Sequence, residues 1–173
     1  MDKAQFWRLI EDAKAKSGGE CEGQAKLLQS LLAALSAEEI VSFDKIFNEF
    51  RAAAYRWDLW GASYLINGGG SDDGFEYFRW WLIGQGREIF ETALAQPDSL
   101  ADIIKDDILW GNGQLECEDI AYAAMEAYQQ KTGRELPYDE QNSRLSEPVG
   151  VKWEEDDLDA MFPKIAAKIN AQE

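Results

Sequence analysis

The chain has 173 residues, of which 46% are hydrophobic and 12% aromatic, so it is long and apolar enough to fold around a single sizeable core. Its formal net charge of −16 repels phosphate backbones, which argues against ordinary nucleic-acid binding. The chain contains no histidine, and this removes histidine-dependent catalytic triads and histidine-containing metal sites.

Acidic charge is concentrated in the second half of the chain. Residues 1–86 contain 9 basic and 13 acidic side chains, a net charge of −4, whereas residues 87–173 contain 8 and 20, a net charge of −12. A field of this sign would steer a basic protein partner toward the chain. The charge also suits solubility alone, and mimicry of a nucleic acid by an acidic face is a third interpretation.

No segment reaches the roughly 18–20 apolar residues of a membrane span, and the N-terminus lacks the charge order of a signal peptide. We therefore expect a cytoplasmic protein without membrane contact or cofactor. Cys21 and Cys117 lack CxxC spacing, so neither a zinc site nor a redox motif is expected. The two thiols could form one disulfide, which the sequence does not decide; without a secretory signal we expect them to be reduced.

Apolar residues recur at helical spacing through the first part of the chain. They predict helices over residues 6–13, 27–35, 40–50 and 57–64, the last being a continuation of the third or a separate helix after a bend. Ser36 and Glu39 have the spacing of a capping box, in which each side chain bonds the other residue's backbone amide. Gly61 is expected at a point of close packing, and the glycines at 68–70 end the fourth segment.

Residues 75–83 are apolar on nearly every face, with only Glu76 and Arg79 interrupting the run. A helix of this kind is normally surrounded by others, so we expect a central, aromatic-rich helix over about residues 73–84. Further helices are predicted over residues 87–95, 97–104, 118–131 and 154–169, with residues 134–153 wrapping the surface. Pro163 is expected to limit or kink the last of them.

No strand pattern, internal repeat or domain boundary is visible in the sequence. The sequence therefore predicts an all-α fold in which residues 1–173 form one compact domain of about seven or eight helices. It does not predict an oligomeric state.

Several short motifs resemble those of a bacterial family, domain-of-unknown-function family 4240. The motifs are Phe6-Trp7, Leu59-Trp60 with Tyr64, the run Ser71-Asp-Asp-Gly-Phe-x-Tyr-Phe-Arg79-x-Trp-Leu82, Gly86 with Phe90, Pro97-Asp98-x-Leu100, and Glu118-x-x-x-Tyr122. The resemblance covers roughly residues 4–133. It implies a bacterial origin and a self-contained domain, and it implies no reaction.

One candidate site consists of Asp72, Asp73, Glu76 and Arg79. With Asp73 as N-cap, Glu76 falls at the third helical position, which is capping-box spacing with aspartate in place of serine. Asp72, Glu76 and Arg79 then share one stripe of the helix with Ile83. In a structural interpretation the acidic residues cap the helix, and Arg79 pairs with Glu76 or Asp72 inside a crowded core.

In a functional interpretation the same stripe is the floor of a pocket roofed by the glycine loop. Arg79 would hold an anionic group, or the carboxylates would take a hard divalent cation such as Mg²⁺. Gly69 and Gly70 would let the loop backbone approach a ligand closely. Trp60 and Tyr64 would form an aromatic wall of the pocket, although core packing explains the same helical spacing. No metal ligand set is assigned.

Two classes of function remain open. The first is a protein-interaction module of immunity or adaptor type, whose partner would be basic. The second is a small-molecule- or metal-binding domain, or a hydrolytic enzyme, that uses the cluster of Asp72, Asp73, Glu76 and Arg79. The sequence favours the interaction module, because the chain lacks a recognisable catalytic motif.

Overall fold

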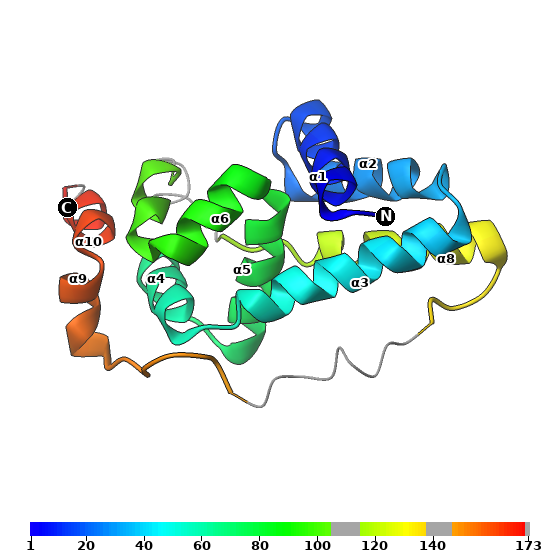
Figure 1. The fold of residues 1–173 in the computed structure, drawn as a ribbon. Coiled ribbons are helices and arrows are strands. Elements are labelled where there is room, and N and C mark those ends of the chain that lie inside the picture. Colours follow the sequence, from blue (N-terminus) through cyan, green and yellow to red (C-terminus); the bar gives the residue numbers. More distant parts are fainter. Residues whose placement is uncertain (105–114, 138–146, 172–173) are drawn as a thin grey trace.

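The structure, a computed structural model, describes residues 1–104, 115–137 and 147–171 (Figure 1). Throughout these residues the regular structure is helical, and the extended pairing is limited to an isolated bridge between Arg56 and Val149. The predicted all-α class is confirmed. Across the same residues, no helix is both long enough and apolar enough to cross a membrane.

The helices follow the sequence predictions closely over the first 100 residues. The elements are α1 (Lys3–Ser17), α2 (Cys21–Ala33), α3 (Ala37–Ala53), α4 (Trp57–Asn67), α5 (Asp72–Gly84), α6 (Arg87–Ala95), the 3₁₀ helix η1 (Pro97–Asp102), α8 (Asp119–Thr132), the 3₁₀ helix η3 (Glu155–Asp157), α9 (Leu158–Met161) and α10 (Pro163–Asn170). The Ser36–Glu39 capping box is present at the start of α3, with both of its hydrogen bonds formed.

Helix α5 is the central element, as its apolar sequence predicted. It packs against α1, α3, α4, α6 and α8. Phe75, Phe78 and Leu82 are almost fully buried in these interfaces. Figure 1 shows α3 and α5 crossing at the middle of the molecule, with α1 and α2 toward one end and α4 and α6 toward the other.

The C-terminal segment packs against α4. Gly61 permits the close approach, since a Cβ atom there would lie 2.9 Å from Trp153 and 3.0 Å from both Leu158 and Phe162. In Figure 1, α9 and α10 lie beside α4 at one edge of the molecule. The predicted close-packing role of Gly61 is confirmed.

The single helix predicted over residues 154–169 is wrong. The chain forms η3 and α9, turns at Phe162, and begins α10 at Pro163. Proline lacks a backbone N–H and clashes with the preceding turn, so it starts a helix more readily than it continues one. Asp98 supports the new start, because its carboxylate accepts hydrogen bonds from the backbone N–H groups of Lys164 and Ile165.

The segment predicted to wrap the surface is described only in part, and residues 138–146 lie outside the described residues. Its later portion lies along the start of α4. Val149 exchanges backbone hydrogen bonds with Tyr55 and Trp57, at 2.9 Å each. Trp153 then donates its indole N–H to the Trp57 carbonyl at 2.8 Å.

Cys21 and Cys117 are joined in a disulfide bond, with their Cα atoms 5.6 Å apart. The expectation of two reduced thiols is therefore wrong for this structure. The cause is tertiary: α2 and α8 pack side by side, Cys21 is the first residue of α2, and Cys117 lies just before α8. This packing brings together two sulfur atoms that are 96 residues apart in the sequence.

Candidate functional site

The start of α5 differs from the prediction. Ser71, and not Asp73, is the N-cap, and its hydroxyl accepts a hydrogen bond from the Gly74 N–H at 3.1 Å. Asp72 and Asp73 are exposed in the first turn, where their negative charge complements the helix dipole. The predicted Asp73–Glu76 capping box is therefore wrong, and Glu76 is free to make a tertiary contact.

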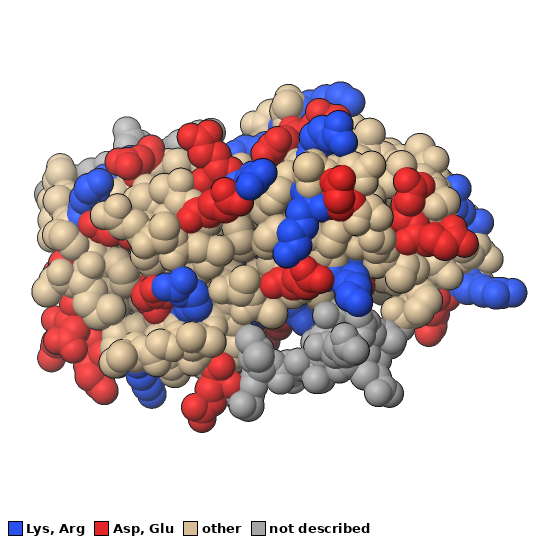
Figure 2. All heavy atoms as spheres, viewed as in Figure 1, with Lys and Arg blue, Asp and Glu red and all other residues tan. Residues whose placement is uncertain are grey.

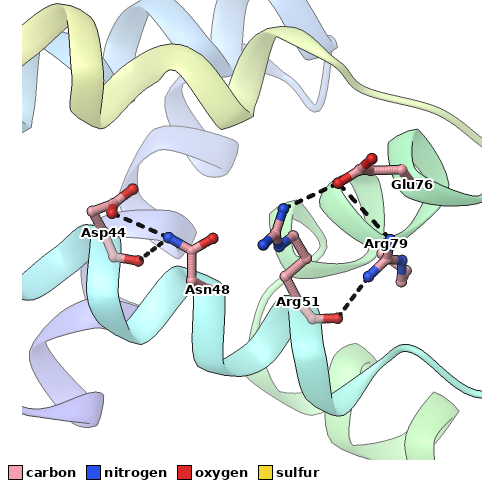
Figure 3. A network of polar contacts seen from close by, with 5 residues as sticks. All are labelled: Asp44, Asn48, Arg51, Glu76 and Arg79. Atoms are coloured by element: carbon pink, nitrogen blue, oxygen red, sulfur yellow. Dashed lines mark hydrogen bonds and ion pairs between the residues drawn. The ribbon is translucent and has the colours of Figure 1, made fainter. Parts of the chain in front are cut away.

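That contact is made with α3 (Figure 3). Oε1 of Glu76 lies 3.0 Å from Nη1 of Arg51 and 3.9 Å from Nη2 of Arg79. Arg79 in turn donates from Nη1 to the Arg51 carbonyl at 3.1 Å. One carboxylate and two guanidinium groups thus connect the centre of α5 to the last turn of α3.

The Arg79 side chain is held inside the protein. The residue is only 8% exposed, and its Cζ atom lies 4.6 Å from the ring centre of Tyr55 and 5.3 Å from that of Phe75. Burial lowers the pKa of Arg79 to about 10, so the side chain still carries its charge at neutral pH. Within the described structure its Nε atom is buried without a hydrogen-bond partner. The Arg79 guanidinium therefore lies against two aromatic rings and forms an ion pair with Glu76 at 3.9 Å.

The two aromatic candidates, Trp60 and Tyr64, make other contacts. Trp60 stacks on Phe75 with ring centres 4.9 Å apart and planes 8° apart, which places it in the α4–α5 interface. Tyr64 faces the C-terminal segment, where its hydroxyl donates to Glu155 at 2.7 Å. Within the described part of the chain, the cation–π contacts of the Arg79 guanidinium are with Tyr55 and Phe75.

The glycine loop closes α4. The Gly69 N–H donates to the Tyr64 carbonyl at 2.8 Å, and Gly68 adopts the left-handed conformation common at helix ends. Among the described residues, a Cβ atom at Gly69 would meet no atom within 4 Å, and one at Gly70 would meet the Tyr64 ring at 4.0 Å. The positions that a side chain would take at Gly69 and Gly70 are therefore open within the described structure. Over the described residues, no three acidic, cysteine or histidine side chains are grouped to hold a metal ion.

A second cluster, which was not predicted from the sequence, lies where α5 meets the start of α8. We call it the Tyr77 face, and it consists of Asp73, Tyr77, Glu116, Glu118 and Tyr122. Two backbone anchors place residues 115–118 beside α4 and α5: the Leu115 N–H donates to Asn67 Oδ1 at 3.0 Å, and the Cys117 N–H donates to the Tyr77 carbonyl at 3.2 Å.

Side-chain contacts hold the Tyr77 face together. The Tyr122 hydroxyl donates to Oε1 of Glu118 at 2.6 Å. Gly74 makes room for Glu116, since a Cβ atom on this glycine would lie 3.1 Å from the carboxylate oxygen Oε1. Asp73, Glu118 and Tyr122 are exposed, whereas Tyr77 and Glu116 are partly buried.

The electrostatics of the Tyr77 face are those of concentrated negative charge. Glu118 raises the pKa of the Tyr77 hydroxyl, and desolvation and the carboxylates of Asp73, Glu76 and Glu116 act in the same direction. The hydrogen bond to Glu118 raises the pKa of Tyr122. Burial raises the pKa of the Glu116 carboxyl. Such a surface favours a cation, which carboxylates attract and tyrosine rings bind by cation–π contact.

The Glu118–Tyr122 spacing of four residues was visible in the sequence as a helical neighbour pair. Its proximity to Tyr77 was not, because the two tyrosines lie on different helices. The Glu118-x-x-x-Tyr122 motif and the Ser71–Leu82 motif, quoted above for the family resemblance, thus meet at this face.

The model of one protein family matches residues 1–130, which include α1 to α6, η1 and most of α8. The chain belongs to the DUF4240 family. This family is described as proteins of unknown function, so membership assigns no reaction to the Tyr77 face or to the Arg79 network. Searches of curated proteins and of solved structures give no match. The DUF4240 match ends before the C-terminal segment that packs on α4.

Proposed function

We propose that this DUF4240 chain is a protein-interaction module of immunity or adaptor type, and that it binds a basic segment of its partner at the Tyr77 face. The observation that carries the proposal is the meeting of three carboxylates and two tyrosine rings from α5, α8 and the segment before α8. Lysine or arginine side chains would lie against the rings and pair with Asp73, Glu116 and Glu118.

The distribution of charge supports binding at one local site over attraction by a uniformly acidic surface. Figure 2 shows one face of the molecule, on which basic side chains are interspersed among the acidic ones over α3 and α6. A partner steered by the net charge of −16 would therefore meet mixed charge over that face. A cluster of carboxylates around tyrosines gives such a partner a defined place to bind.

The alternative function places a small molecule, a metal ion or a hydrolytic reaction at Asp72, Asp73, Glu76 and Arg79. The unpartnered Nε atom of Arg79 supports it. We favour the interaction module because the remaining guanidinium contacts are already made with Glu76, the Arg51 carbonyl and two aromatic rings. A bacterial origin and a cytoplasmic location belong to the same proposal.

Fluorescence anisotropy with a labelled nona-arginine peptide tests the proposal. The triple variant Asp73→Asn, Glu116→Gln, Glu118→Gln removes three charges from the Tyr77 face, and we expect it to lose about tenfold or more in affinity, or roughly 1.4 kcal/mol. The control variant Glu154→Gln, Asp156→Asn, Asp157→Asn removes the same charge from the segment before α9 and is expected to bind nearly as well as the wild type.

Two results would contradict the proposal. If the wild type does not bind the peptide at low ionic strength, the chain is not a module for basic segments. If both triple variants lose the same affinity, net charge alone attracts the peptide and the Tyr77 face is not the site. Glu155 is left unchanged in the control because it accepts the hydrogen bond from Tyr64.

A further inference from the structure

We propose that the Cys21–Cys117 disulfide is a redox-controlled clamp that holds the Tyr77 face in the form that binds a basic partner. The inference rests on the proposed function for its binding readout. The observation behind it is the position of Cys117 between two members of the face, Glu116 and Glu118. Any constraint on Cys117 is therefore a constraint on both carboxylates.

Cys117 connects the Tyr77 face to two helices. Its N–H donates to the Tyr77 carbonyl on α5, and its sulfur is bonded to Cys21 at the start of α2. Leu115 supplies a further anchor through Asn67. Cleavage of the disulfide would leave residues 116–118 held by these hydrogen bonds, by the buried side chains of Leu115 and Cys117, and by the packing of α8 on α2. Glu116 and Glu118 would then be less firmly positioned beside Tyr77.

The two cysteine residues differ in exposure, which favours attack at Cys21. Cys21 is partly exposed, whereas Cys117 is 4% exposed. The thiolate of a dithiol reductant would attack Sγ of Cys21, the S–S bond would break, and Cys117 would leave as a thiolate and take up a proton. The second thiol of the reductant then attacks the mixed disulfide and releases Cys21. The protein gains two electrons and two protons, and the reductant becomes a disulfide.

Negative charge next to the disulfide slows this reaction. Oδ2 of Asp119 lies 3.8 Å from Sγ of Cys21, and Glu116 and Glu118 flank Cys117. These carboxylates repel the incoming thiolate and disfavour the departing one. Binding of a basic segment would neutralise part of this charge. The clamp is thus connected electrostatically to the same surface that it supports.

A cytoplasmic location would give the clamp a use. Disulfides in a reducing compartment are usually transient and redox-sensing, whereas those in an oxidising compartment are permanent. The location proposed above therefore favours a bond that opens and closes over one that serves only stability.

The test measures binding of labelled nona-arginine to the full chain before and after reduction with dithiothreitol, with mass spectrometry confirming the state of the cysteines. We expect reduction to weaken binding by about fivefold or more. The double variant Cys21→Ser, Cys117→Ser should bind like the reduced chain and should not respond to dithiothreitol. Equal affinity of the oxidised and the fully reduced wild type would overturn the proposal.

Amide hydrogen exchange separates failure of the clamp from failure of the proposed function. Reduction should speed exchange at Cys117, whose N–H donates to Tyr77, while exchange in the interior of α3 stays unchanged. Faster exchange without peptide binding in either state would reject the proposed function and retain a clamp on the segment. Unchanged exchange at Cys117 after complete reduction would reject the clamp.

The rate of disulfide reduction tests whether the nearby carboxylates slow the reaction. Asp119→Asn should be reduced severalfold faster by dithiothreitol than the wild type at low ionic strength, and the difference should shrink in salt. Asp156→Asn, in the segment before α9, is the control of equal charge change and should leave the rate unaltered. Equal rates for the wild type and Asp119→Asn would contradict the repulsion described above.

Discussion

Arg79 carries a charge within the interior and is held by packing as much as by pairing. Replacing it with alanine removes its contacts with Tyr55 and Phe75, whereas Glu76 keeps its ion pair with Arg51. We expect Arg79→Ala to lower the free energy of unfolding by about 2–4 kcal/mol. Arg79→Met fills most of the volume without a buried charge, and we expect it to cost less than about 1.5 kcal/mol.

Urea denaturation followed by circular dichroism would measure both variants. If Arg79→Met lowered the free energy of unfolding more than Arg79→Ala does, the packing of the Arg79 side chain would not be its main contribution to stability. Binding of a metabolite anion that stabilises the wild type and not Arg79→Met would support the alternative ligand site.

The two tyrosines of the Tyr77 face lose their hydroxyl protons at higher pH than an unperturbed tyrosine does. The pKa values of Tyr77 and Tyr122 are raised above the usual 10.0, with Glu118 the leading cause for both. Because the folded-state pKa exceeds that of the unfolded chain, the unfolded chain loses its protons first as the pH rises past 10.0. The stability that these protons contribute is present below that pH and is lost as the pH rises through the folded-state values.

Tyrosinate absorbance measured against pH checks this expectation. Glu118→Gln should move part of the absorbance change to lower pH, since it removes the main cause of both shifts. Glu155→Gln removes the carboxylate that accepts the Tyr64 hydrogen bond, so it should lower the pKa of Tyr64 and leave those of Tyr77 and Tyr122 unchanged. A titration curve that Glu118→Gln leaves unchanged would contradict the assigned electrostatics of the Tyr77 face.

At the scale of elements, the contact between α4 and the C-terminal segment depends on a residue without a side chain. Gly61→Ala places a methyl group 2.9–3.0 Å from Trp153, Leu158 and Phe162, which is closer than packed atoms tolerate. We expect a loss of about 1–3 kcal/mol in the free energy of unfolding. We also expect faster proteolysis near α9, because the segment must move away from α4.

Gly70→Ala is the control, because among the described residues its methyl group would meet the Tyr64 ring alone, at 4.0 Å. Thermal unfolding and limited proteolysis of the two variants compare a crowded glycine with an open one. Equal stability of Gly61→Ala and the wild type would mean that the C-terminal segment is not tightly packed on α4.

Local sequence patterns predicted the elements well where one signal dominated. Ser36 with Glu39 marked the start of α3, and the nearly continuous apolar run of residues 75–83 marked the central helix. The prediction failed at the start of α5, where Ser71, Asp72 and Asp73 are all good capping residues and only the backbone conformation selects the first. The break at Phe162 was anticipated only as a limit or kink at Pro163.

At the scale of the whole molecule, the sequence could not supply contacts between distant segments. The Cys21–Cys117 bond spans 96 residues and forms because α2 and α8 pack together. The Tyr77 face likewise needs α5 and α8 side by side. Arg79 was expected to pair with Glu76 or Asp72, and the sequence did not indicate that Arg51 on α3 would also pair with Glu76. Periodicity identifies the buried side of a helix, and it does not identify the helix that covers it.

The most direct test of the proposed interaction is a chemical-shift map of the isotope-labelled, oxidised chain titrated with nona-arginine. We expect shift changes that saturate and that lie at residues 73–77 and 116–122, the two stretches that form the Tyr77 face. Changes confined to residues 154–157, the acidic stretch before α9, or spread in proportion to surface charge, would contradict it. In that case the Tyr77 face would be an acidic surface without a role in binding.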